Sequence, residues 1–264
     1  MQYGSISQAP SSIGEAHSAA TTDLDMTLGA RHLRHSRRVQ GVALLGALPL
    51  VFVAWVILSR ALDLDVIFVA RAAWLTAVPV LAVIIFAPLF LPYPRELCWR
   101  GYILHWFCFS SLWILIWEVP PVVYRSAFEN VAHTQASLPY YIWWWGYFSS
   151  DLDYGGLTPF FVLAELSFWV IAIPIAAALV RLWRGRDAQA FALFGLSGAL
   201  QFYNVCFFIG YGGIVERFAN IATDSILAPL LYWILNGLWG LAGGAAAVFS
   251  FLYLFRIHVR CPTA

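Results

Sequence analysis

Long apolar stretches of about 20 residues or more divide the sequence, and charged or proline-rich segments separate them. A helix needs about 20 apolar residues to cross the roughly 30 Å hydrocarbon core of a bilayer. In lipid, only helices and closed barrels satisfy all of their backbone hydrogen bonds. We therefore predict an all-α integral membrane protein, a polytopic bundle of about six transmembrane helices. The expected helices cover residues 41–59, 66–92, 101–123, 158–181, 189–212 and 226–255.

The remaining segments give the domain organisation. Residues 1–38 are polar, rich in Ser and Ala, and end in a basic run, which predicts a disordered cytosolic tail. The first apolar stretch begins too late and runs too long for a cleavable signal peptide. The bundle is expected over residues 39–257, and residues 258–264 form a short tail.

Charge predicts the orientation of the bundle. All 15 basic residues are Arg, because the sequence has no Lys. With the N-terminus inside, 11 Arg lie in cytosolic segments and only four in outer segments, which favours cytosolic termini. The outer four are Arg60, Arg71, Arg125 and Arg217. The expected location is the endoplasmic reticulum for a eukaryotic protein or the plasma membrane for a bacterial one. A net charge of +1 gives no reason to expect a nucleic-acid partner. A homodimer is compatible with the sequence.

One connection, residues 124–157, is unusually long and contains an aromatic run over residues 139–148. Tryptophan and tyrosine gather at membrane–water interfaces. We expect a short interfacial or re-entrant segment here. Asp151 and Tyr154 follow it and could be a site, a solvated loop or a further interface anchor.

Two glutamates, Glu118 and Glu165, lie inside apolar stretches. An ionisable side chain at membrane depth costs about 3 kcal/mol or more, so a functional site is the default interpretation. Asn204 and Asn236 occur on two further expected helices, all within roughly 8–17 Å of the outer surface at about 1.5 Å per residue. Polar groups in lipid need partners, which predicts that these side chains converge.

These residues also have structural interpretations. A buried Asn or Gln often joins two helices by a hydrogen bond. For Asn204 this structural interpretation has the same weight as a functional one, and for Gln201 it is favoured. Tryptophans such as Trp117 and Trp239 are commonly packing residues or interface anchors.

A protonated carboxyl group in a dry aromatic pocket can give its proton to an alkene. Tryptophan faces and a second, ionised carboxylate would stabilise the resulting carbocation. The four cysteines show no metal-binding spacing, and no phosphate loop or catalytic triad is evident. The sequence therefore favours acid–base isomerisation or cyclisation of a hydrophobic small molecule drawn from the bilayer, without a metal or cofactor.

Three segments together resemble the emopamil-binding protein family, the EXPERA-domain proteins, which include sterol Δ8–Δ7 isomerases and the sigma-two receptor. Asp151, Tyr154 and Glu165 match the aspartate–tyrosine–glutamate block, and residues 201–205 and 232–239 are similar to two later segments. The resemblance covers about residues 98–256. It implies that Glu118 and Glu165 are catalytic acids, and that Asn236 and Trp239 contact the substrate and its cationic intermediate. Asp151, Tyr154, Asn204 and Trp117 complete the expected substrate-binding set.

The sequence departs from this family at two positions. Ile114 stands where the isomerases have a His, and Phe168 stands where they have a Thr. Trp117 and Glu118 also resemble the tryptophan–glutamate motif of membrane-bound meroterpenoid cyclases. The missing His favours a non-catalytic sterol or lipid binder as the competing hypothesis. A transporter fits less well because no inverted repeat is visible.

Overall fold

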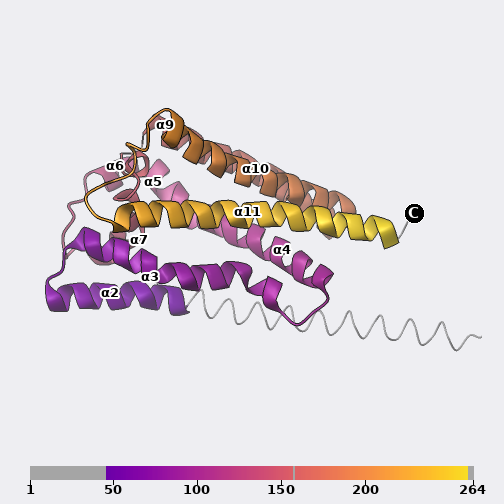
Figure 1. Ribbon diagram of the computed structural model, residues 1–264, viewed down its shortest axis with the longest axis horizontal. Helices are drawn as coiled ribbons and strands as arrows, with labels where there is room; N and C mark the ends of the chain where they lie inside the picture. The colour runs from indigo at the N-terminus through magenta and orange to yellow at the C-terminus, as the bar shows by residue number, and fades with distance from the viewer. Residues whose placement is uncertain (1–45, 157, 261–264) are drawn as a thin grey trace, which may run out of the picture. The chain divides into compact units, whose positions relative to one another are not determined.

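The computed structural model describes residues 46–156 and 158–260 (Figure 1). The predicted tail over residues 1–38 lies outside these residues. The described elements are the helices α2 (Leu48–Leu62), α3 (Val66–Phe86), α4 (Arg95–Trp113), α5 (Val119–Val123), α6 (Arg125–Glu129), α7 (Leu138–Phe148), α8 (Leu152–Gly155), α9 (Pro159–Trp183), α10 (Asp187–Ile214) and α11 (Leu227–Arg260), with the 3₁₀ turn η2 (Ala87–Phe90) and the π-helical turn η3 (Ile114–Glu118). The prediction of an all-helical bundle is confirmed for this part of the chain.

Five segments of the described chain are long and apolar enough to cross a membrane, as expected of a multi-pass membrane protein. They are Val66–Phe90, Arg95–Val123, Pro159–Trp183, Asp187–Ile214 and Leu227–Arg256. The helix α2, which corresponds to the first predicted span, covers only 15 described residues.

Helix α4 starts earlier than the sequence suggested, at Arg95 instead of residue 101. The charged pair Arg95 and Glu96 looked like a break between helices. Pro94 precedes the first turn, where a missing N–H costs nothing, and Glu96 faces the positive end of the helix dipole. The charges therefore begin the helix instead of interrupting it.

The three C-terminal helices pack in order, α9 on α10 and α10 on α11, while α4 packs on α11 and α3 packs on α2 and α7 (Figure 1). Small residues allow the closest of these approaches. A Cβ on Gly198 of α10 would lie 2.7 Å from the backbone nitrogen of Ala247 in α11. Glycine at this contact lets the two backbones meet, as is typical of helix pairs in membranes.

Charged residues gather at the two ends of the bundle. At one end, the buried Arg71 pairs with Asp224 at 2.8 Å and also donates to Ser149 and Ser225. At the other end, where α4 begins and α11 ends, ion pairs join Arg100 to Asp187 and Arg256 to Glu96 (Figure 1). The end marked by Arg71 carries α7 and α8 and is called here the α7 end.

The long connection, where a short interfacial or re-entrant segment is expected, contains the helix α7, and much of this helix is buried in the bundle. Leu138 and Ile142 are almost fully buried, whereas Tyr140 is 73% exposed. The α3 residue Trp74 donates its indole N–H to the Trp143 carbonyl at 2.8 Å. Helix α7 is therefore a packed part of this end of the bundle, in addition to any interfacial role of its exposed face.

Gly146 is the point where α7 lies closest to α3, and it gives a direct test of this packing. A Cβ there would lie 2.3 Å from Trp74 Cδ1 and 2.5 Å from the Ala70 carbonyl oxygen. We expect Gly146→Ala to destabilise the fold by about 1–3 kcal/mol through overpacking. Thermal unfolding of the detergent-purified protein measures this, with Gly210→Ala as the control because a Cβ there meets nothing within 4 Å. Equal melting temperatures for the two variants would contradict the close α3–α7 contact.

Candidate functional site

Glu118 ends a π-helical turn whose origin lies in the two prolines that follow. The Val119 N–H bonds to the Ile114 carbonyl, five residues back, which widens the helix at this turn. Pro120 and Pro121 have no N–H to continue the regular ladder. The Trp117 carbonyl, which the residue at 121 would normally bond, instead accepts from the Trp144 indole of α7 at 2.9 Å. The proline pair thus opens the helix at Glu118 and ties it to α7.

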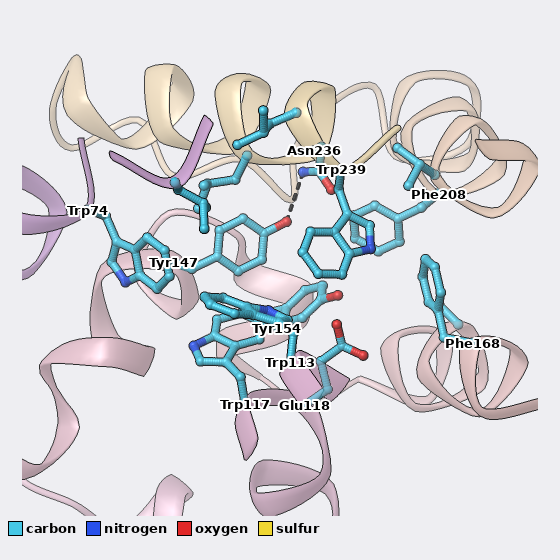
Figure 2. A pocket seen from close by; sticks show the side chains of 15 residues that line it. Trp74, Trp113, Trp117, Glu118, Tyr147, Tyr154, Phe168, Phe208, Asn236 and Trp239 are labelled. Carbon is cyan, nitrogen blue, oxygen red and sulfur yellow. Dashed lines mark hydrogen bonds between the residues drawn. The ribbon is translucent and has the colours of Figure 1, made fainter. Parts of the chain in front are cut away.

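A pocket lies beside this turn (Figure 2). Its walls come from α3, α4, η3, α7, α8, α9, α10 and α11 and are mainly aromatic and aliphatic. The lining residues are Trp74, Leu81, Trp113, Trp117, Glu118, Tyr147, Tyr154, Ala164, Phe168, Val205, Phe208, Leu235, Asn236, Leu238 and Trp239. A mainly apolar and aromatic lining with a few polar groups is typical of small-molecule sites.

Glu118 is the acid of the pocket, and Glu165 stands directly behind it. Glu118 is 5% exposed and Glu165 is fully buried, and their carboxyl groups are close enough to share a hydrogen bond. The Tyr154 hydroxyl donates to Glu165 Oε1, while one oxygen of each glutamate has no protein partner. Two buried carboxyl groups in contact do not both carry a charge unless a cation lies beside them, so this pair holds a proton when the pocket contains no cation.

A second phenol–carboxyl pair joins the pocket to the α7 end. The amide of Asn236 donates to the Tyr147 hydroxyl at 2.8 Å (Figure 2), and this hydroxyl donates to Asp151 Oδ2 at 3.3 Å. Asp151 also caps α8 by accepting from the backbone N–H groups of Asp153 and Tyr154. Burial, followed by the nearby Asp153 carboxyl, raises the pKa of Asp151 to about 8. Asp151 therefore titrates close to neutral pH.

Indole rings surround the space in front of Glu118. The Trp113 ring lies 5.8 Å from Trp117 and 5.9 Å from Trp239, measured between centroids. Figure 2 shows the Glu118 carboxyl pointing toward the Tyr154 hydroxyl, with Trp239 above it. Aromatic faces with this spacing can attract a cation in a site that excludes water.

Most of the residues singled out from the sequence come together here. Glu118, Trp117, Tyr154, Asn236 and Trp239 line the pocket. Glu165 and Asp151 are not in the lining, but each is one hydrogen bond behind a tyrosine that is.

Asn204 is the exception. It is outside the lining, and its amide bonds Ser167 Oγ at 2.9 Å and the Ala164 carbonyl at 3.4 Å. The structure therefore supports helix–helix contact between α9 and α10 for Asn204 in place of the expected substrate contact. Gln201 likewise joins two helices by accepting from the Trp106 indole at 2.8 Å.

Sequence reasoning missed several lining residues, of which Tyr147 matters most. The available signal was its spacing, because a helical residue four positions before Asp151 lies one turn away on the same face. Phe168, where the resemblance expects Thr, lines the pocket. Ile114, where it expects His, is buried in the core outside the lining.

The chain matches no protein-family model, no curated protein and no solved structure. Within the described residues, no group of three or more His, Cys, Asp or Glu side chains could hold a metal ion.

Proposed function

We propose that this protein is an intramembrane acid–base isomerase that shifts a double bond in a sterol-like or terpenoid substrate through a carbocation. The observation that carries the proposal is a buried carboxyl group, Glu118, inside a pocket walled by indole rings and backed by a second buried carboxyl. An apolar pocket among apolar helices suits a substrate that enters from the bilayer.

In this proposal Glu118 is the proton donor, because it faces the pocket and Glu165 does not. The Glu118 O–H bond breaks, the alkene π electrons form a new C–H bond, and a cation remains on the neighbouring carbon. Trp113, Trp117 and Trp239 present π faces to that cation, and the Glu118 carboxylate left behind opposes its charge. Loss of a proton from an adjacent carbon then forms the shifted double bond. Capture of the cation by a second alkene would give a cyclase instead.

The membrane topology belongs to the same proposal. The Arg distribution favours both termini in the cytosol. The helix Leu48–Leu62 would then belong to a sixth span. With both termini in the cytosol, the pocket, which lies toward the α7 end, would lie in the outer half of the bundle.

A second candidate is a non-catalytic receptor for an amphipathic amine or sterol. One observation favours it: an aromatic box with a buried carboxyl is also the arrangement that recognises an ammonium ligand. Such a receptor would bind without exchanging protons with its ligand, and this difference separates the two candidates.

Deuterium incorporation tests the proposal. The full-length chain in nanodiscs would be incubated in deuterated water with cholest-8-en-3β-ol, squalene and geranylgeraniol, and the recovered lipids analysed by mass spectrometry. An isomerase or cyclase places deuterium on carbon in at least one probe, and a binder places none. Recovery of all three probes without carbon-bound deuterium would overturn the enzymatic proposal for these substrate classes and leave the receptor.

A further inference from the structure

The second phenol–carboxyl pair connects the pocket lining to a buried carboxyl group outside the lining. Tyr147 lines the pocket, and its hydroxyl bonds both Asn236 at 2.8 Å and Asp151 at 3.3 Å. Asp151 is fully buried and is not among the residues that line the pocket. The ring centroids of Tyr147 and Tyr154 are 4.8 Å apart. The Tyr147–Asp151 pair therefore lies next to the Glu118–Glu165 pair, with a ring contact and no hydrogen bond between them.

Beyond Asp151, a group of buried polar side chains continues toward the surface at the α7 end. Asp153 lies close to Glu216 in the loop between α10 and α11, and Asn220 of the same loop faces the Tyr232 hydroxyl. Asp153 Oδ2, Glu216 Oε2, both amide atoms of Asn220 and the Tyr232 hydroxyl lack a hydrogen-bond partner in the protein. Buried polar groups of this kind normally bond ordered water. Because the Glu216 side chain is only half-buried, the group reaches solvent.

We propose that Tyr147 and Asp151 form the proton-accepting end of the pocket, and that the polar group around Asp153 connects them to water at the α7 end. This inference rests on the proposed function. It assigns the group that removes a proton from the carbon next to the cation, a role given to neither glutamate. It makes the pocket asymmetric, with a donor at Glu118 and an acceptor at Tyr147.

In the acceptor step, a C–H bond next to the cation breaks, its electrons form the new double bond, and its proton passes to the Tyr147 oxygen. The phenol's own proton moves at the same time to the Asp151 carboxylate, so Tyr147 stays neutral. After the product leaves, water in the pocket returns one proton to Glu118, and Asp151 gives one proton to water through the group around Asp153. No proton is consumed over the cycle.

The acceptor role predicts a pH dependence. Asp151 must be ionised to accept a proton, and its pKa of about 8 means that the ionised fraction grows as pH rises through that value. The groups facing it are Tyr147 from α7, Asp153 and Tyr154 from α8 and Tyr232 from α11. Turnover limited by this step should therefore rise with pH, with a midpoint near pH 8.

Two conservative variants test the assignment on the probe that gives deuterium incorporation. Tyr147→Phe keeps the ring and removes the hydroxyl, and Asp151→Asn keeps an acceptor oxygen for the α8 cap. Each should lower kcat by about 100-fold or more, the usual contribution of a positioned acid or base, and leave KM nearly unchanged. Asp151→Asn should also flatten the rise near pH 8. Tyr102→Phe is the matched control, because Tyr102 is equally buried but bonds the Ala242 carbonyl outside the pocket.

An infrared titration provides a readout that needs no substrate. Lowering the pH through 8 should produce a protonated carboxyl band in the wild type that is absent in Asp151→Asn and shifted in Tyr147→Phe. Wild-type kcat and pH profile in Tyr147→Phe, or the same band in Asp151→Asn, would overturn the acceptor assignment even if deuterium enters the probes. A correct infrared result without deuterium incorporation would instead refute the proposed isomerase and keep Asp151 as the group that titrates.

Discussion

Replacing Glu118 by Gln should reduce kcat by about 1,000-fold or more, within the range that a general acid contributes. Glutamine has nearly the same size and can occupy the same turn of η3. It cannot, however, give a proton to carbon. The probe should still bind, because the indole walls and the apolar lining are unchanged. Carbon-bound deuterium, followed over time in nanodiscs, measures the loss directly.

A matched variant controls for the loss of a carboxyl group as such. Glu96→Gln removes an acid from the other end of α4, where Glu96 pairs with Arg256 at 3.4 Å, and should leave turnover within about twofold of the wild type. Glu118→Asp keeps an acid but withdraws it by one methylene, so partial activity is expected. Full activity in Glu118→Gln with a normal melting temperature would remove Glu118 from the chemistry.

The long apolar helices could be predicted because their signal is local and strong. Each depends on a single stretch of apolar residues, and five of the six predicted stretches correspond to long apolar helices. Their ends were less certain, as at Arg95, because a charged residue can either interrupt a helix or begin one. Only the packing of the first turn decides between these alternatives.

The convergence of polar residues could be predicted from depth alone, although depth does not determine which way a side chain faces. Glu118 and Asn236 point into the pocket, but Asn204, expected at similar depth, turns toward Ser167 and joins α9 to α10. Rotating a helix about its axis by less than one turn would move such a side chain from the pocket to a helix–helix contact, or the reverse. Rotation is set by packing between helices, such as the close contact at Gly198, which no local pattern reveals.

The position of α7 was the feature of the site that the sequence predicted least well. The aromatic run over residues 139–148 suits an interface, and that interpretation hid Tyr147 as a candidate for the site. The following prolines leave the Trp117 carbonyl without its helical partner, so it accepts a hydrogen bond from the Trp144 indole and holds α7 against the bundle. Two segments far apart in the chain must both be placed before that bond can be recognised.

Glu165→Gln should lower kcat by about 100-fold while Glu118 is intact. This effect is similar in size to those expected of Tyr147→Phe and Asp151→Asn. Glu165 does not line the pocket and is connected to it only through Glu118 and Tyr154, so it acts as a positioning residue. Its carboxyl contacts that of Glu118 and accepts from Tyr154, and the two acids share a proton that neither could hold as firmly alone. Glutamine preserves the shape of the pair but not the shared proton. Tyr154→Phe, which removes only the hydrogen bond to Glu165, should cost about 10-fold, since bonds to charged groups contribute about 1.5–3 kcal/mol.

A double-mutant cycle separates positioning from an independent catalytic role. If Glu165 acts only through Glu118, the variant that carries both Glu118→Gln and Glu165→Gln should be no slower than Glu118→Gln alone, because groups that work as a unit are not additive. Glu165→Asp should recover part of the activity, which loss of packing alone would not explain. If instead the two losses multiply, Glu165 acts on the reaction separately from Glu118, and the assignment of a single donor in the pocket is wrong.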